Sequence, residues 1–311
     1  MRRRLVARAT LLAAVLSGGC ELQEVSLADV EDVIVAEVYA NLGEEPADNQ
    51  VLAFLHRTLS GDDTSVEDLL ASTITVSRSD GFALTLFNGD REECVESIPD
   101  GSSGACFTSD PEDARILEPG DLLELRIDFV TGEVLEGATL LPGAFGLEDV
   151  PGTCRLSPNT PFPLSWSRSE GAWAYVNETS IRGLPEALRP EGIEVDDDPL
   201  YLLGLSVSDA DTDIVFPSEF GVFNRFELDQ DLSVRLQRGL PEGTAAEVTI
   251  TAVERNYVNW ARGGSFNPSG QVRVPSLRGE GTGVFGGAVG RRFVVVSSGD
   301  AGLPIPLCLG S

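Results

Sequence analysis

Short runs of alternating apolar and polar residues, rich in β-branched and aromatic side chains, recur along the chain. They end at turn sequences such as Ser79-Asp80-Gly81 and Asn88-Gly89-Asp90. Many short strands of this kind, separated by turn residues, are typical of antiparallel sandwiches. The pattern therefore predicts an all-β fold with two antiparallel β-sandwich domains. The predicted strands include residues 33–39, 73–77, 82–87, 122–129, 133–141, 163–167, 172–176, 232–236, 247–253 and 293–296.

Helical patterns are few, and we expect short helices only at 64–70 and 184–188. The sequence GAFGLEDVPG, from Gly143 to Gly152, interrupts the strand pattern and indicates a domain boundary. The predicted organisation is a signal peptide at 1–19, a tether at 20–30, one sandwich at 31–145 and a second at 150–311.

The first twenty residues, MRRRLVARATLLAAVLSGGC, have a basic start, a short apolar core and small residues before Cys20. This order is typical of a secretory signal peptide, and the apolar run is too short to span a bilayer. The segment resembles bacterial lipoprotein signals, in which the cysteine is lipidated and becomes the mature N-terminus. We therefore expect an exported protein anchored to a membrane, in particular the outer membrane, through acyl chains on Cys20. The alternative is a secreted protein in which Cys20 has no such role.

Acidic residues dominate the charge. After removal of residues 1–19 the chain carries 18 basic and 50 acidic residues, a formal charge near −32, and every basic residue is arginine. Such a surface repels phosphate groups, which argues against binding to nucleic acid or to anionic lipid heads. Solubility explains the acidity, and cation-dependent adhesion or calcium binding is the alternative.

Four cysteines remain besides Cys20, and an even number in an exported chain indicates disulfides. Four cysteines allow three pairings, of which we favour two bonds that would close a Gly- and Ser-rich loop and join the start of the second half to the chain's end. These bonds are Cys94–Cys106 and Cys154–Cys308. Structural zinc is not expected, because no CxxC spacing exists and His56 is the single histidine.

The glycine-rich stretch RGEGTGVFGG, residues 278–287, resembles a phosphate-binding loop at first sight. Such a loop needs a helix after the glycines and usually a lysine, whereas here a β-branched run follows and the chain has no lysine. We therefore expect no nucleotide and no other cofactor. The glycines are predicted to supply turns with positive φ between strands.

Two groups of residues are candidates for ligand contact. Asp209, Asp211 and Asp213 alternate like the ligands of a calcium loop; an acidic solvated loop is the favoured interpretation, and a weak calcium site is the alternative. A second set of five aromatic residues could form a platform that stacks on sugar rings, but packing in the core or at a domain interface is the favoured interpretation for Trp166, Trp173, Tyr175, Tyr257 and Trp260. Tyr257 and Trp260, which lie between polar residues, are the better candidates for exposure and ligand stacking.

Catalysis has little support, and we predict that the protein is not an enzyme. A serine triad would have to use His56, which lies among apolar neighbours, and no G-x-S-x-G sequence occurs. Paired carboxylates of a glycoside hydrolase stay open as an alternative, because a chain with 50 acids always offers pairs.

Two resemblances extend these predictions. The second half has a Trp-bearing strand, the corner Leu240-Pro-Glu-Gly-Thr244 and a strand that ends in Thr251-Ala-Val253, and in this it is similar to fibronectin type III and related immunoglobulin-like domains. The sequences RNYVNWARGG (255–264) and VPSLRGEGTGVFGG (274–287), together with the lipoprotein start, resemble an uncharacterised family of Gram-negative outer-membrane lipoproteins. The runs VIVAEVYA, TITVSRSDGFALTL and EPGDLLELRIDF of the first half fit the same family.

The second resemblance implies β-sandwich domains, no assigned catalytic residues and a TonB-dependent receptor as partner, because members are often encoded beside such receptors. The predicted function is a lipid-anchored binding or assembly module of the cell envelope, which could serve as an accessory to an outer-membrane receptor or another envelope protein. A carbohydrate-binding or carbohydrate-cleaving surface protein and a purely structural envelope lipoprotein are the alternatives.

Overall fold

The protein is mostly β-structure with a few short helices. The computed structural model describes residues 32–58, 66–94, 104–217, 230–263 and 273–308. Its strands are β1 Ile34–Leu42, β2 Gln50–Arg57, β3 Thr73–Arg78, β4 Ala83–Asn88, β5 Gly104–Ser109, β6 Leu122–Asp128, β7 Val134–Leu140, β8 Thr153–Leu156, β9 Phe162–Ser165, β10 Ala174–Arg182, β11 Leu200–Leu205, β12 Asp213–Phe216, β13 Ala245–Val253, β14 Arg278–Gly279 and β15 Thr282–Ser297. Its helices are η1 Pro46–Asp48, α2 Glu67–Leu70, α3 Arg91–Cys94, α4 Pro111–Ala114, α5 Leu184–Leu188, η2 Arg189–Glu191, α6 Gln230–Leu236 and α7 Arg255–Gly263.

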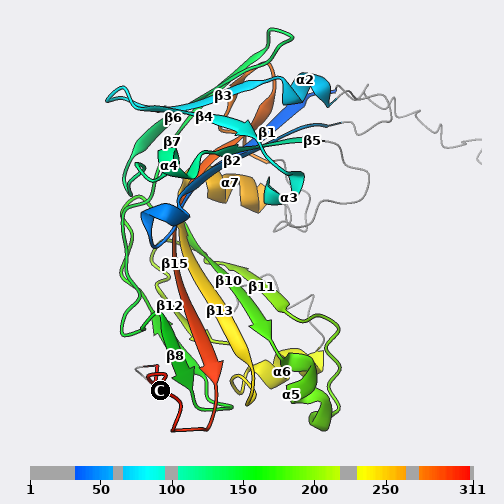
Figure 1. The fold of residues 1–311 in the computed structure, drawn as a ribbon, viewed down its shortest axis with the longest axis vertical. Coiled ribbons are helices and arrows are strands. Elements are labelled where there is room, and N and C mark those ends of the chain that lie inside the picture. The colour runs from blue at the N-terminus through cyan, green and yellow to red at the C-terminus, as the bar shows by residue number, and fades with distance from the viewer. Residues whose placement is uncertain (1–31, 59–65, 95–103, 218–229, 264–272, 309–311) are drawn as a thin grey trace, which may run out of the picture. The chain divides into compact units, whose positions relative to one another are not determined.

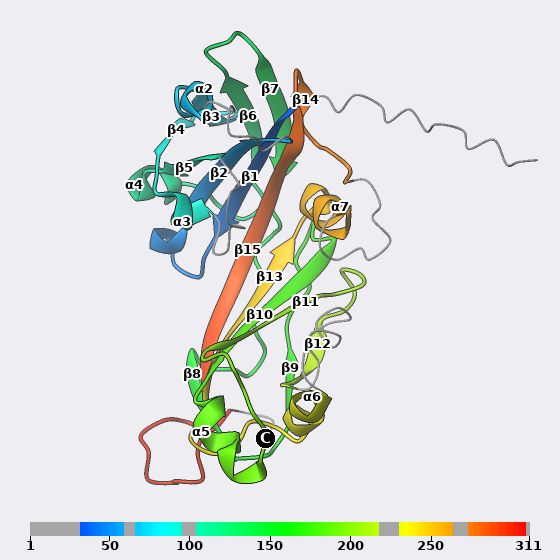
Figure 2. The ribbon, with the colours of Figure 1, turned by 90° about the vertical axis from the view of Figure 1, so that its right-hand side faces the viewer.

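One large sheet contains most of these strands, in the order β11-β10-β13-β15-β1-β2-β5-β4-β3-β6-β7-β14, with β8 added to β15. The first-half strands form a curved part of this sheet (Figure 1). Strand β7 pairs with the short strand β14, which continues into β15 beside β1 (Figure 2). The all-β, sandwich-like class that the alternating pattern predicts is confirmed.

The core of the first half is formed by side chains that alternate along its strands. On β1 the inward positions Ala36, Val38 and Ala40 are fully buried. On β6 the inward positions Leu123, Leu125 and Ile127 are also buried, while Glu124 and Arg126 face outward. Successive side chains of a strand point to opposite faces, so a period of two places one apolar set inside the curved sheet.

The second half packs two sheets against each other. The inner positions of β10 and β13, including Ile181 and Ile250, belong to the same core cluster as Phe162 and Phe216 of the small β9–β12 sheet. Trp166 and Tyr175 meet within this layer with ring centroids 5.4 Å apart. Face-to-face packing of two β-sheets through such residues is the sandwich arrangement that the sequence predicts.

Strand β15 connects the two halves. Its first half pairs with β1 from Thr282 to Val289, and its second half pairs with β13 as far as Val296. The pairing with β1, like that with β8, is parallel, so the expectation of purely antiparallel sheets is wrong for this strand. The division into domains at 31–145 and 150–311 stays a prediction, but residues 282–289 of the second range add a strand to the sheet of the first.

The glycine-rich stretch was predicted to form turns, and that prediction is wrong for most of it. Gly283, Gly286 and Gly287 lie within β15. A Cβ atom on Gly283 would lie 1.9 Å from the Ala36 carbonyl oxygen, and φ at this position is 145°. A Cβ on Gly287 would lie 2.8 Å from a methyl carbon of Leu141. The glycines allow β15 to approach β1 and the core closely.

The helix predictions were partly right. Helices occur at α2 and α5, inside or at the predicted ranges 64–70 and 184–188. Residues 232–236, predicted as a strand, form the end of α6. There Leu232 and Leu236 are buried while Val234 is 46% exposed, as a spacing of four on a helix requires. Helix α7 was not predicted.

Both disulfides are the favoured pairs. Cys94 of α3 is bonded to Cys106 of β5, and Cys154 of β8 is bonded to Cys308 near the chain's end. The second bond fixes the C-terminal segment to the strand that lies beside β15.

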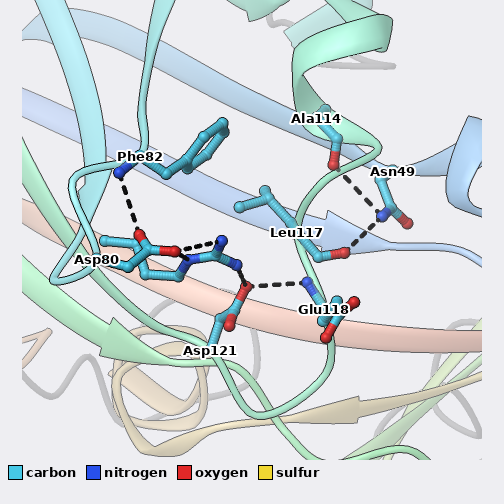
Figure 3. Close-up of polar contacts among 8 residues, drawn as sticks. Asn49, Asp80, Phe82, Ala114, Leu117, Glu118 and Asp121 are labelled. Carbon is cyan, nitrogen blue, oxygen red and sulfur yellow. Dashed lines mark hydrogen bonds and ion pairs between the residues drawn. The ribbon is translucent and has the colours of Figure 1, made fainter.

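Polar contacts secure the connections between the first-half strands. Arg78, at the end of β3, forms ion pairs of 2.8 Å with Asp80 and with Asp121 (Figure 3). The buried Asn49 amide donates to the carbonyl oxygens of Ala114 and Leu117, at 3.4 and 3.0 Å. The Arg78 ion pairs join the β3–β4 turn to the turn before β6, and the Asn49 hydrogen bonds hold the β1–β2 connection against the end of α4 and the segment that follows it.

The predicted signal peptide, the predicted lipidation site Cys20 and the whole predicted tether lie outside the described residues. Within the described ranges, none of the helices combines the length and the apolar character needed to cross a bilayer.

Candidate functional site

The large sheet has a second face, opposite the core, on its β10-β13-β15-β1 portion. Alternation places Glu178 of β10 and Thr249 and Thr251 of β13 on this face, and Gly290 of β15 lies beside them. Glu178 is exposed and the other three are half-buried. We call this surface the open face. Small side chains at its centre leave the strand backbones close to solvent.

Helix α7 covers one end of the open face, where it lies against β15 (Figure 2). Its Val258 packs into a small cluster with Val176 and Ala288 of the sheet, and its Trp260 packs against Val35 and Val284. The amphipathic spacing of Tyr257, Val258 and Trp260 places apolar side chains toward the strands, so the rest of the open face begins at the edge of this helix.

Glu254, directly before α7, fixes the position of the helix. Its buried carboxylate accepts hydrogen bonds from the backbone N–H groups of Asn256 and Tyr257, at 2.6 and 2.8 Å, and from Gly287 of β15 at 3.3 Å. Burial raises the pKa of Glu254, and these hydrogen bonds oppose the rise. The Asn256 amide in turn donates to the carbonyl oxygens of Ala138 and Phe285, on β7 and β15.

A groove with a volume of about 610 Å³ lies on the open face beside α7. Its floor includes Thr249, Thr251, Ala288 and Gly290. Tyr257 closes the end nearest the helix. The volume is within the range of small-molecule and peptide sites, about 300–1,000 Å³.

Carboxylates line the groove on two sides. Glu44, Glu45 and Asp48 come from the connection between β1 and β2, and Glu178 comes from β10. All four side chains are exposed. Arg292 is the basic residue among the described lining, and it forms a 3.4 Å ion pair with Glu247. The groove therefore carries net negative charge.

A half-buried polar cluster lies under α7, next to the groove. The Glu37 carboxylate is 3.0 Å from the Arg273 guanidinium and 3.6 Å from the His56 ring nitrogen Nε2, and it accepts a 3.1 Å hydrogen bond from the Tyr39 hydroxyl. Arg273 also lies over the ring of Trp260, 4.8 Å from its centroid.

Opposing effects set the protonation of this cluster. Burial by itself raises the pKa of Glu37, but the hydrogen bond from His56 and the positive charge of Arg273 outweigh it, so the pKa lies below its ordinary value. Burial, together with the charges of Glu178 and Glu37, raises the pKa of Tyr257 to about 12. Glu37 is thus ionised and Tyr257 is neutral at physiological pH.

The predicted exposure of Trp260 is wrong. Trp260 is 6% exposed, because α7 turns its indole toward Val35 and Val284, so it offers no face to a sugar. Tyr257 is half-buried and contributes to the end of the groove. Trp166 and Tyr175 are core residues, whereas Trp173 is 47% exposed and carries Arg255 over its ring at 5.0 Å.

The three acidic residues predicted as a weak calcium site have separate partners or settings. Asp209 forms an ion pair with Arg168, and Asp211 accepts hydrogen bonds from the backbone N–H groups of Val207 and Ser208. Asp213 begins β12. No group of three metal-binding side chains occurs within the described part of the chain. Calcium binding stays an untested prediction.

Sequence reasoning did not find the groove. Glu44, Glu45 and Asp48 occur in a stretch, NLGEEPADNQ, that reads as an ordinary polar turn, and Glu178 is more than 120 positions away. The alternation within 174–182 and 245–253 identifies one polar face on each strand, but their neighbours on β1 and β15 depend on long-range pairing. His56 lies in β2 and contacts Glu37.

Comparison with known proteins adds little to this description. No protein-family model matches the chain, and no curated protein matches it in sequence. One solved structure found in the comparison is described as the two tandem V-type regions of VCBP3, a v-region-containing chitin binding protein. The alignment covers 81% of this chain and 99% of that chain, with 9% sequence identity and a TM-score of 0.17. A likeness at this level carries no functional information.

Proposed function

We propose that the protein is an exported, lipid-anchored binding module of the cell envelope that docks a partner in the acidic groove of its open face. The observation that carries this proposal is the groove itself: a concave surface of about 610 Å³ whose walls bear four exposed carboxylates. Clefts lined by charge of one sign attract oppositely charged partners and increase their rate of association.

The rigidity of the groove supports the same function. Its floor consists of paired strands of the large sheet, and α7 is held beside it by the buried Glu254 and by the Asn256 amide. A preformed site loses little conformational entropy on binding. The resemblance described for the sequence adds a TonB-dependent receptor as the proposed partner, and Cys20 as the proposed anchor to the outer membrane.

Site-specific photo-crosslinking in cells that produce the full chain tests the proposal. A photoreactive residue replaces Thr249 on the groove floor, and in the control it replaces Thr85, an exposed threonine of β4. The expected result is an adduct with one envelope protein from position 249 and none from position 85. Adducts from both positions, or from neither, contradict docking in the groove. Mass spectrometry of the mature N-terminus tests the anchor separately, and an unmodified Cys20 contradicts it.

A carbohydrate-binding surface is the second candidate, and one observation favours it. Tyr201 of the edge strand β11 pairs with Ser180 on the open face, and its side chain is 67% exposed. An exposed aromatic ring beside hydroxyl and carboxylate groups suits a sugar. A glycan array with the wild-type chain and with Tyr201→Ala tests this function. Binding that Tyr201→Ala abolishes supports it, and binding that the substitution leaves unchanged argues against it.

A further inference from the structure

From the chemistry of the groove we infer that its occupant is an extended cationic segment of a partner protein, with arginine or lysine side chains lying along the floor. This inference rests on the proposed function and assigns the class of partner. It is argued from the floor, from the walls and from an arginine that the same face already binds.

The floor fits an extended chain better than a compact ligand. Thr249 and Thr251 of β13 lie beside Gly290 of β15, where a Cβ atom would meet nothing closer than 3.6 Å. Adjacent strands are about 4.8 Å apart, so a floor made from several strands is wide enough for a peptide backbone.

The walls select positive charge. Glu44, Glu45 and Asp48 stand on one side and Glu178 on another, and the basic residue of the described lining, Arg292, is already paired with Glu247. Carboxylates on separate elements suit several cationic groups spaced along a chain. They do not converge as the ligands of one metal ion do, and no metal-binding cluster occurs among the described residues.

An arginine of this chain shows how the open face holds a guanidinium group. Arg273 lies 4.8 Å over the ring of Trp260 and 3.0 Å from the Glu37 carboxylate. Tyr257, whose ring centroid is 5.3 Å from that of Tyr39, is the next aromatic side chain along the face and lines the groove together with Glu178. The groove thus contains an aromatic ring and a carboxylate, the combination that binds Arg273.

Fluorescence anisotropy with defined peptides tests the inference. The probe is a labelled octapeptide of alternating arginine and threonine, and the comparison peptide carries uncharged citrulline in place of each arginine. The full mature chain is titrated in detergent at about 50 mM and about 500 mM salt, because screening weakens contacts between exposed charges. The variant is Glu45→Gln/Glu178→Gln, and the matched control, which removes the same charge elsewhere, is Glu112→Gln/Glu124→Gln on α4 and β6.

We expect the arginine peptide to bind and the citrulline peptide to bind at least tenfold more weakly. The groove variant should weaken binding of the arginine peptide about tenfold, and the control variant less than twofold. Equal effects of the two variants overturn the inference, because they show attraction to the net charge alone. Binding of chitohexaose in the groove without binding of the arginine peptide also overturns it. If position 249 crosslinks an envelope protein but the peptide does not bind, the proposed function holds and the cationic partner is wrong.

Discussion

Replacement of Gly283 by alanine tests how β15 is held between the two halves of the protein. The new Cβ would lie 1.9 Å from the Ala36 carbonyl oxygen, so β15 and β1 would have to separate by about 1.5 Å to reach ordinary contact. That displacement breaks two or three neighbouring ladder hydrogen bonds, each contributing about 1 kcal/mol. The φ of 145° adds strain of about 1–2 kcal/mol for a residue with a side chain. We expect Gly283→Ala to lower the free energy of unfolding by about 3–5 kcal/mol.

Two glycines of the same strand provide a graded comparison. At Gly287 the Cβ would lie 2.8 Å from a flexible methyl group of Leu141, and we expect a loss of about 1–3 kcal/mol. At Gly290 the nearest atom would be 3.6 Å away, and we expect a change below about 1 kcal/mol in either direction.

Urea denaturation of the oxidised chain, followed by tryptophan fluorescence, measures the three free energies from the transition midpoint and slope. The expected order of destabilisation is Gly283→Ala, then Gly287→Ala, then Gly290→Ala. If Gly283→Ala unfolds within about 1 kcal/mol of the wild-type chain, or if Gly290→Ala is the most damaging of the three, close strand approach is not the reason for glycine at these positions.

Three further predictions follow from buried contacts. Asn49→Ala should lower the free energy of unfolding by about 2–4 kcal/mol, because it removes three hydrogen bonds: those that the Asn49 amide donates to the Ala114 and Leu117 carbonyls and the one that its oxygen accepts from the Gly43 N–H. Asn88→Ala, which removes one exposed hydrogen bond, should cost less than about 1 kcal/mol, and similar urea midpoints of the two variants would refute this difference. The pKa of Glu37 is lowered in the folded state, so its ionised form stabilises the fold above the ordinary pKa of 4.5. Glu37→Gln should therefore lower the free energy of unfolding at pH 7, and the difference from the wild-type chain should disappear as the pH falls below 4.5. A difference in urea midpoints that does not change with pH would contradict this prediction. Replacement of Cys154 and Cys308 by alanine opens a loop that spans 154 positions and should lower the free energy of unfolding by about 5 kcal/mol on the chain-entropy model. Differential scanning calorimetry measures the loss, and an unchanged Tm would refute it.

Much of the fold follows from local sequence pattern. Alternation at 73–77, 122–129 and 247–253 predicts strands that the structure contains, because a period of two is itself the geometry of a half-buried strand. Short elements are harder to assign from sequence. The residues LSVRL at 232–236 match a strand through Leu232, Val234 and Leu236 and a helix through Leu232 and Leu236, and only the tertiary burial of the two leucines decides for the helix.

The glycine-rich stretch marks the limit of local reasoning. Glycine is the residue of turns and also of close backbone approach, and a sequence alone does not separate the two uses. At Gly283 the structure shows which use applies, because the Ala36 carbonyl of β1 occupies the place where a side chain would lie. The same long-range pairing assembles the groove, whose acidic walls come from the β1–β2 connection and from β10. The favoured disulfides were predictable, because few cysteines leave few pairings.

The shared strand β15 also governs the order in which the chain can complete its fold. Val35 pairs with Thr282, so β1 reaches its partner only after residue 282 has been synthesised. Until then β1 and β13 each have one edge uncovered, and such edges pair readily with other chains. A polypeptide that stops before residue 282 would lack the element both halves require, so aggregation rather than a smaller folded protein is the expected fate of a truncated product.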